Sequence, residues 1–314
     1  MQQPPIIVVA GPTASGKTRL AVELALTLDG EVLSCDSMQL YRHMDIGTAK
    51  PTAEEMRGVP HHMIDVIDPA ESFSVGRYVE MAAPILEDIR RRGKAVILCG
   101  GTGLYADSLL LGRDFAPMPR TGRREELEAL ADRAGIEAVI ERLRAVDPEA
   151  AARLHPSDRK RIIRAMEVYL ETGQTITDHD RASKAQPPKY RALWLGLTFA
   201  DRAALYDRIN RRVDQMVEQG LAEELASLLQ LGLPPGATSL QAIGYKEPLR
   251  ALRGEISWDE AWDLVKQESR RYAKRQLTWL RRNEQIHWIV QDAPLDWTKT
   301  WSEAQTILRE AGLL

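Results

Sequence analysis

The feature that most constrains this sequence is a glycine-rich segment placed between an apolar run and a helical pattern. The apolar run covers residues 6–10, and helical spacing of apolar side chains begins near residue 19. Strand, loop and helix in this order are the context in which the pattern G-x-x-x-x-G-K-[ST] binds phosphate. The segment that matches this pattern consists of Gly11, Pro12, Thr13, Ala14, Ser15, Gly16, Lys17 and Thr18.

This phosphate loop indicates which kind of ligand the protein binds, but it does not indicate which reaction follows. Its backbone N–H groups and the N-terminus of the following helix favour a di- or triphosphate. Lys17 would place a charge on the terminal phosphate, and the hydroxyl of Thr18 would help to hold Mg²⁺. The sequence therefore predicts an α/β core that binds a phosphate compound.

Length and composition set broad limits on the protein. A chain of 314 residues, 44% hydrophobic and 28% charged, has room for an α/β core and one further domain. No apolar stretch approaches the ~20 residues that span a bilayer, and no signal peptide is recognisable, so we expect a cytoplasmic protein without membrane partners. Cys35 and Cys99 are far apart, which argues against a disulfide framework or a cysteine zinc site.

Two predicted strands end in polar residues that belong at the ligand-binding edge of a parallel sheet. Residues 31–36 end in Asp36, and residues 95–99 lead into a glycine-rich loop that contains Thr102. Asp36 could act as a base, or it could cap a following helix. The adjacent His61 and His62, on a predicted strand over residues 61–69, would point to opposite faces and are not expected to share a metal ion.

Strand patterns stop over the middle of the chain. We predict a core over residues 1–114, a helical insertion over 115–190, and a second core part over 191–314. Helices are expected at residues 123–133, 135–146 and 158–171, followed by a polar loop at 181–188. Within the last of these helices, Lys160 and Arg164 lie four residues apart on one face.

A basic helix is predicted over residues 267–283. Its apolar stripe contains Ala273, Leu277 and Leu280, and the opposite face is basic. Residues 266–284 hold seven basic and two acidic side chains, whereas the whole chain has a net charge of −3. This contrast indicates a local binding surface for a polyanion. Because the helix is distant in sequence from the phosphate loop and carries no candidate base, we expect it to supply binding and not chemistry.

The residues alone leave two reaction classes open. A single carboxylate beside a phosphate loop suits proton abstraction during group transfer. The transferred group could be a phosphoryl group, as in a kinase, or a group whose transfer releases pyrophosphate. No acidic residue directly follows the apolar strand at residues 95–99, where a motor ATPase would use one to hold Mg²⁺, which disfavours that class.

Six segments together resemble the motif set of the tRNA dimethylallyltransferase family. The resemblance implies transfer of a dimethylallyl group from its diphosphate to N6 of adenosine 37 in tRNAs that read codons beginning with U. It implies a P-loop NTPase-like, nucleotide-kinase-like parallel sheet core with an inserted helical domain, Mg²⁺ as cofactor, and a monomer that binds the anticodon stem-loop. The segments are residues 11–18, 36–42, 45–51, 100–105, 241–245 and 274–281.

The same resemblance implies roles for individual residues. The phosphate loop would hold the diphosphate, with Lys17 neutralising the leaving group and Thr18 at the metal. Asp36 would accept the N6 proton, Thr102 would lie beside it, and Arg211 would reach the departing pyrophosphate. The implied tRNA contacts are Asp36, Ser37, Met38, Gln39, Thr102, Arg124, Lys160, Arg161, Ile162, Ile163, Arg164, Gln241, Ala242, Ile243, Gly244, Tyr245, Lys246, Lys274, Arg275, Gln276, Leu277, Thr278, Trp279, Leu280 and Arg281. Arg123 could take the place of Arg124.

Two alternatives remain at this stage. An adenylate isopentenyltransferase would use free AMP, ADP or ATP as acceptor, but such enzymes are generally shorter and lack the tRNA-binding region. A nucleotide kinase would need a second clamp for the acceptor phosphate, and none is recognisable. The basic helix is the feature that favours tRNA.

Overall fold

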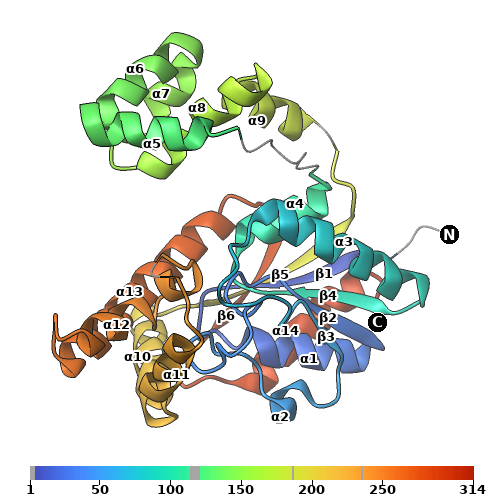
Figure 1. Cartoon of the computed structure of the whole chain (residues 1–314). Coiled ribbons are helices and arrows are strands. Elements are labelled where there is room, and N and C mark those ends of the chain that lie inside the picture. Colours follow the sequence, from blue (N-terminus) through green and yellow to red (C-terminus); the bar gives the residue numbers. More distant parts are fainter. Residues whose placement is uncertain (1–3, 114–120, 186, 235) are drawn as a thin grey trace. The chain divides into compact units, whose positions relative to one another are not determined.

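The computed structural model describes residues 4–113, 121–185, 187–234 and 236–314. The chain divides into two compact units, one formed by Met1–Gly112 with Lys189–Leu314 and the other by Arg113–Pro188 (Figure 1). The predicted domain boundary at residue 115 lies outside the described residues. The second predicted boundary, at residue 190, lies close to the observed return of the chain.

The first unit is built on a six-stranded parallel sheet with the order β3-β2-β4-β1-β5-β6. This architecture confirms the predicted α/β fold. The strand predicted over residues 61–69 is wrong in length, because the left-handed backbone at Met63 and Asp65 turns the chain away after two residues. The strands are β1 (Ile6–Ala10), β2 (Gly30–Ser34), β3 (His61–His62), β4 (Ala95–Cys99), β5 (Ala192–Phe199) and β6 (Ile286–Gln291).

Alternate side chains of the strands supply two separate hydrophobic cores. Ile6 and Val8 of β1 belong to the core beneath α3 (Val75–Arg91) and α4 (Gly103–Leu111). Ile7 and Val9 belong to the opposite core, which also contains residues of α1 (Lys17–Thr27) and α14 (Trp297–Glu310). Figure 1 shows these two helical layers on either side of the sheet. A strand buried on both faces explains the uninterrupted apolar run at residues 6–10.

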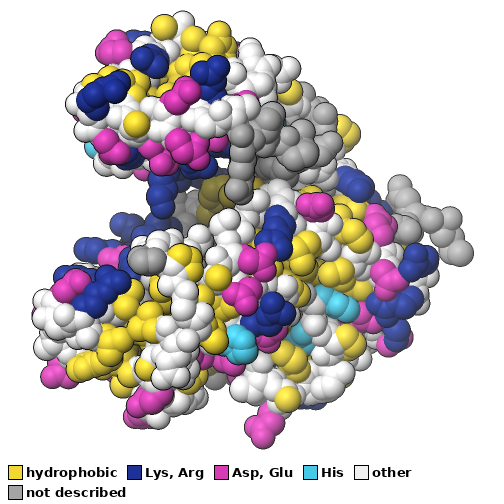
Figure 2. Space-filling view, in the orientation of Figure 1, with side chains coloured by type: hydrophobic (Ala, Val, Ile, Leu, Met, Phe, Trp, Pro, Cys, Tyr) yellow, Lys and Arg dark blue, Asp and Glu magenta, His cyan; other side chains and the backbone are white. Residues whose placement is uncertain are grey.

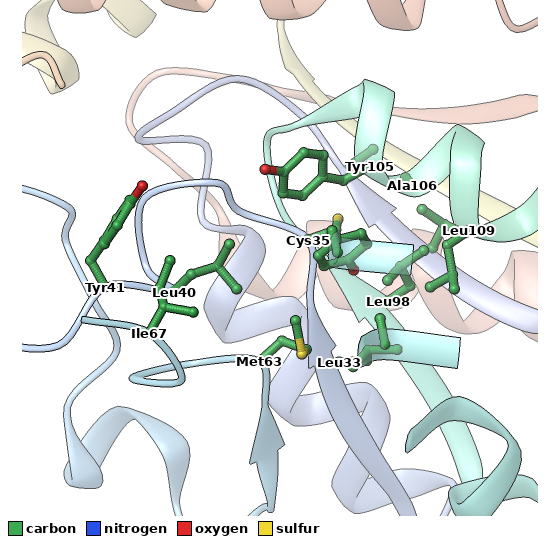
Figure 3. Close-up of a cluster of buried hydrophobic side chains, with 14 of the residues drawn as sticks. Leu33, Cys35, Leu40, Tyr41, Met63, Ile67, Leu98, Tyr105, Ala106 and Leu109 are labelled. Carbon is green, nitrogen blue, oxygen red and sulfur yellow. The ribbon is translucent and has the colours of Figure 1, made fainter. Parts of the chain in front are cut away.

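The core beneath α3 holds the loop that follows β2. Tyr78 on α3 is fully buried, and its hydroxyl donates a hydrogen bond to the carbonyl oxygen of Ser34 at 2.9 Å. Figure 3 shows Leu40 and Tyr41 packed in the same cluster as strand residues such as Leu33. This packing restrains both ends of the loop that contains Asp36.

The second half of this unit adds helices that surround the carboxyl ends of the strands. The long helix α13 begins at residue 258, earlier than predicted, where Ser257 caps it by accepting a hydrogen bond from the N–H of Glu260. The predicted start is too late because the basic pattern covers only the later turns of this helix. The helices here are α10 (Arg202–Glu218), α11 (Leu221–Gln230), α12 (Lys246–Leu252) and α13 (Trp258–Leu280), with a 3₁₀ turn at Ser239–Gln241. The short helix α2 (Ala53–Met56) lies earlier in the chain, between β2 and β3.

The second unit is helical throughout its described residues. The predicted loop over residues 181–188 is wrong in part, because α9 continues to residue 185. Thr175 accepts a hydrogen bond from the N–H of Asp178 at the start of this helix, and Thr177 is bonded to the buried carboxylate of Asp147. The helices are α5 (Arg123–Ala134), α6 (Ile136–Val146), α7 (Pro148–Arg153), α8 (Arg159–Thr172) and α9 (Ile176–Ala185).

Within the described residues, no helix is both long enough and apolar enough to cross a bilayer.

Candidate active site

A cavity of about 780 Å³ opens at the carboxyl edge of the sheet. Its wall contains the phosphate loop, the loops after β2 and β4, one face of α10 and part of α13. These segments are distant in sequence and meet because parallel strands deliver their following loops to one edge. The cavity is in the size range of small-molecule sites.

The phosphate loop has the backbone needed to wrap an anion. Gly16 is left-handed at φ 89°, and a Cβ atom on Gly11 would lie 2.7 Å from the carbonyl oxygen of Leu197. Helix α1 starts at Lys17 without a side-chain cap. The first N–H groups of α1 are therefore left for an anion, together with the positive end of the helix dipole.

Lys17 is a half-buried cation in the wall of the cavity. Its ammonium donates a hydrogen bond to the carbonyl oxygen of Pro12 at 2.8 Å, and burial lowers the pKa of Lys17. Among the described residues, no carboxylate forms an ion pair with it. A bound diphosphate would supply the missing counter-charge, because an opposite charge at close range favours the protonated amine.

Asp36 has one carboxylate oxygen engaged in the fold and one that is not. Its Oδ1 accepts hydrogen bonds from the N–H groups of Met38 at 2.9 Å and Gln39 at 3.4 Å. The residues that follow form a turn, so the helix that Asp36 could have capped is not present in this segment. Oδ2 has no hydrogen-bond partner in the described part of the chain, and it is available to a ligand in the cavity that Asp36 lines.

Thr102 connects the loops after β2 and β4. Its hydroxyl oxygen accepts a hydrogen bond from the N–H of Ser37 at 3.1 Å and donates one to the Ser37 hydroxyl at 3.3 Å. The phenol of Tyr272 on α13 lies close to Thr102 and Gln276. Burial, followed by the negative charge of Asp36, raises the pKa of Tyr272, so the phenol remains protonated at neutral pH.

Helix α13 contributes Gln276 to the wall of the cavity. Its side-chain oxygen accepts a hydrogen bond from the N–H of Thr13 at 2.9 Å, and its amide nitrogen donates to the carbonyl oxygen of Gly101 at 3.0 Å. The side chain is buried, so Gln276 is placed between two loops of the core and not on the surface predicted to bind tRNA. Helix α13 therefore also supports two loops of the cavity wall, while its role in binding and not chemistry stays a prediction.

The arginines of α10 differ sharply in their surroundings. Arg211, predicted to reach pyrophosphate, is ion-paired with Asp207 and its side chain is 70% exposed. Arg212 is half-buried, and its side chain donates to the carbonyl oxygen of Ala49 at 3.5 Å. Arg208 donates to the carbonyl oxygen of Ala14 in the phosphate loop at 3.1 Å.

Burial lowers the pKa of both Arg208 and Arg212, and neither has an ion-pair partner within the described residues. All three arginines line the cavity, but the two unpaired ones suit an anion better than Arg211 does. The sequence already contained a hint of this difference. Asp207 lies four residues before Arg211, the spacing of an ion pair on a helix, whereas Arg212 has another cation, Arg208, at that position.

The residues predicted for tRNA in the first unit divide into buried and accessible sets. The side chains of Tyr245 and Leu280 are buried and stabilise the fold, Ala242 is buried at the cavity wall, and Leu277 is half-buried, so their contacts with tRNA stay predictions. The members that line the cavity are Asp36, Ser37, Met38, Gln39, Gln241, Ala242, Ile243, Gly244, Lys246, Arg275 and Gln276. The exposed members on α13 and directly after it are Lys274, Arg275, Thr278, Trp279 and Arg281.

Trp279, near the C-terminal end of α13, is packed against helix α4. Trp279 donates a hydrogen bond from its indole nitrogen to Asp107 at 2.9 Å. A Cβ atom on Gly103 would lie 2.3 Å from the Trp279 ring, so only glycine permits this approach. Figure 2 shows Lys and Arg side chains intermixed with Asp and Glu on the visible face, in agreement with a local and not a general basic character.

In the second unit, the predicted polar contacts lie on the surface and the apolar ones do not. Arg124, Lys160, Arg161 and Arg164 are exposed, and Arg164 forms an ion pair with Glu167 at 2.9 Å. Ile162 and Ile163 are buried in the core of this unit. The two isoleucines are therefore corrected from tRNA contacts to residues that hold α8 in place.

The paired histidines have separate partners. His61 is bonded to the carbonyl oxygen of Val59 at 2.8 Å, and His62 is bonded to Glu31 at 2.7 Å. Among the described residues, no three His, Cys, Asp or Glu side chains come together as a metal site.

Comparisons with known proteins identify a family and relatives that are similar over most of this chain. The sequence profile of the family described as IPP transferase matches residues 39–283. A tRNA dimethylallyltransferase of Geobacter metallireducens is 48% identical over 291 residues, which cover 93% of this chain and 94% of the relative.

Two solved structures are also similar. The tRNA isopentenylpyrophosphate transferase of Bacillus halodurans superimposes with a TM-score of 0.73 and 43% identity, covering 99% of this chain and 97% of that one. A eukaryotic dimethylallyltransferase acting on tRNA gives a TM-score of 0.84 at 28% identity, covering 99% of this chain and 79% of that one.

Proposed function

Because the chain belongs to the IPP transferase family, we propose that it transfers a dimethylallyl group from dimethylallyl diphosphate to a tRNA. One structural observation supports this proposal independently of the names of the relatives. The phosphate loop with its half-buried cations and the available oxygen of Asp36 line a single cavity, and that cavity extends to the basic helix α13. The arrangement suits a reaction in which a diphosphate leaves while a proton is removed from the acceptor.

We propose N6 of adenosine 37, in tRNAs that read codons beginning with U, as the acceptor. Attack by N6 forms a C–N bond at C1 of the allylic group, and the C1–O bond breaks with its electron pair leaving on the diphosphate. Asp36 accepts the N6 proton through Oδ2, since Oδ1 is occupied by the N–H groups of the turn. Lys17, Arg208 and Arg212 stabilise the negative charge on the departing diphosphate.

The adenine must leave the anticodon-loop stack to reach this cavity. Ser37, Met38 and Gln39 line the cavity beside Asp36 and would form the slot for the base. The exposed cations Lys274, Arg275 and Arg281 lie on or directly after the helix that supplies Gln276, so contacts to the tRNA backbone would form next to the site. This proximity supports a tRNA acceptor over a free nucleotide.

Mg²⁺ is proposed as the cofactor. Thr18 lines the cavity next to Lys17, and Asp36 and Glu55 are carboxylates in the same wall. This donor set fits Mg²⁺, which is commonly held by few protein ligands together with substrate phosphates. When bound with the diphosphate, Mg²⁺ would supply additional charge neutralisation for the leaving group. For the protein itself, a cytoplasmic location and a monomeric state are likewise proposed.

The test is transfer of labelled dimethylallyl diphosphate to bulk tRNA or to AMP. We expect label in tRNA, at adenosine 37 after nuclease digestion, and none on AMP. Lys17→Ala is the matched control, because it removes the half-buried cation while leaving the exposed face of α13 intact. Label found only on AMP would establish an adenylate isopentenyltransferase instead.

A further inference from the structure

Glu224 on α11 is bonded to a loop that forms part of the cavity wall. Its Oε2 accepts hydrogen bonds from the N–H groups of Asp45 and Ile46, both at 2.8 Å. Its Oε1 accepts from the N–H of Gly47 at 3.1 Å and from the hydroxyl of Tyr245 at 2.6 Å. Within the described residues no cation pairs with this carboxylate, so its charge is satisfied by four neutral donors.

The loop that Glu224 holds covers residues 45–50 and is further restrained by a close packing contact. A Cβ atom on Gly47 would lie 2.5 Å from the ring of Tyr245, so a side chain at this position would displace the ring. Tyr245 is fully buried, and burial together with the charge of Glu224 raises its pKa. The phenol therefore remains a hydrogen-bond donor to Glu224 at neutral pH.

The far end of this loop touches two residues of the site. The carbonyl oxygen of Ala49 accepts hydrogen bonds from the side-chain amide of Gln39 at 3.1 Å and from the guanidinium of Arg212 at 3.5 Å. The carbonyl oxygen of Thr48 accepts a second bond from Gln39 at 3.3 Å. For Arg212, Ala49 is the protein acceptor seen in the described part of the chain, so this carbonyl orients a half-buried cation that has no ion-pair partner there.

We propose that Glu224 is a positioning residue for the diphosphate site, acting through the loop at residues 45–50 to orient Arg212. The carboxylate fixes three consecutive N–H groups, which fixes the carbonyl of Ala49 and with it the guanidinium. A misplaced guanidinium would not align with a diphosphate, since arginine binds phosphate through a planar fork. This inference rests on the proposed function only for the identity of the diphosphate ligand.

Glu224→Gln tests the proposal with almost no change in volume. The amide presents an N–H group toward donors, so it cannot accept all four bonds. We expect the KM for dimethylallyl diphosphate to rise about tenfold, as for the loss of one charge-assisted hydrogen bond. Thermal protection by inorganic pyrophosphate should weaken in parallel. Glu223→Gln is the matched control, because Glu223 is exposed and its side chain has no hydrogen bond in the described structure.

A double mutant separates positioning from simple stabilisation of the fold. If Glu224 acts through Arg212, then Glu224→Gln should add nothing to the KM effect of Arg212→Ala. A lower Tm with unchanged KM and unchanged pyrophosphate protection would overturn the proposal, as would additive effects in the double mutant. If Glu224→Gln does not fold, Tyr245→Phe provides the test, because it removes one of the four hydrogen bonds to Glu224. We then expect a smaller increase in KM, and an unchanged KM would contradict the positioning role.

The pyrophosphate measurement also distinguishes this inference from the proposed function. Absence of transfer to tRNA by the wild-type protein would refute the activity. Pyrophosphate protection that depends on Glu224 and Arg212 would still support the positioning role in that case.

Discussion

Gln276 on α13 accepts a hydrogen bond from the backbone N–H of Thr13 in the phosphate loop, at 2.9 Å across 263 positions of sequence. The same side chain donates to Gly101 in the loop after β4. One buried amide thus joins the helix expected to face tRNA to two loops that border the diphosphate site. Binding at one of these sites is therefore physically connected to the other.

The first prediction concerns this connection. Gln276→Glu keeps the acceptor for Thr13 but replaces the donor to Gly101 with a negative charge beside the phosphate loop. We expect the KM for dimethylallyl diphosphate to rise by about tenfold or more, because a charged side chain repels the diphosphate and leaves Gly101 unpaired. Thr278→Ala, on the exposed face of the same helix, should leave this KM unchanged. Equal values for both variants would show that the Gln276 contacts do not support diphosphate binding.

Asp36→Asn should abolish base assistance while preserving the turn. An asparagine oxygen can still accept the hydrogen bonds of Met38 and Gln39, so the loop should keep its shape. We expect kcat to fall by ~10²–10⁴ with both substrates still bound, which is the usual size of general-base catalysis. Single-turnover transfer at saturating tRNA and diphosphate measures this step directly. A rate within about threefold of wild type would rule out a base of that strength.

The arginines of α10 provide a matched pair. Arg212→Ala removes a half-buried guanidinium that has no ion-pair partner within the described residues. It should raise the KM for dimethylallyl diphosphate by about 10–100-fold, the range for removal of a charged hydrogen bond. Arg211→Ala removes an exposed side chain paired with Asp207 and should have an effect of about threefold or less. Steady-state kinetics with varied diphosphate decides between them. The reverse order of effects would restore the sequence-based choice of Arg211.

The exposed cations at the C-terminal end of α13 should control tRNA binding. Replacing Lys274, Arg275 and Arg281 with alanine should weaken binding and flatten the plot of log K against log salt by about 0.7–0.9 for each tRNA phosphate that is no longer neutralised. Filter binding at several salt concentrations measures this slope. An unaltered slope would mean that the face is solvated and does not bind phosphate.

The last prediction concerns stability and pH. Glu31 on β2 is buried and contacts Arg92 and His62. Hydrogen bonds from Arg92 lower the pKa of Glu31 from 4.5 to about 2, outweighing the effect of burial. Because this folded-state pKa lies below the unfolded value, the stabilisation is complete above pH 4.5 and is lost as pH falls toward 2.

Glu31→Gln should therefore lower the free energy of unfolding at pH 7 by on the order of 2–3 kcal/mol. The difference from wild type should shrink as the pH is lowered through this window, as measured by urea unfolding at several pH values. Glu54→Gln, at an exposed position of α2, serves as the control and should change stability little. A difference that stays constant down to pH 3 would contradict the assignment to the Glu31 charge.

Local pattern was enough to predict much of this protein. The phosphate loop, the strands at residues 6–10 and 95–99 and three helices of the second unit, α5, α6 and α8, follow from spacing within a few residues. The position of Asp36 at the ligand-binding edge follows from the rule that parallel strands end at one edge. Such features depend on backbone propensity and on alternation of apolar side chains, which the sequence alone determines.

The roles of Gln276, Arg212, Tyr272 and Glu224 were decided by tertiary structure. Each depends on a partner far away in the chain, such as Thr13 for Gln276 and the N–H groups of residues 45–47 for Glu224. On a helical wheel Gln276 is only a polar residue beside a basic face, and Arg212 is not distinguished from Arg211 by residue type. Hydrogen bonding and burial distinguish these residues. Both properties depend on which segments come together at the edge of the sheet, and no local sequence pattern predicts that.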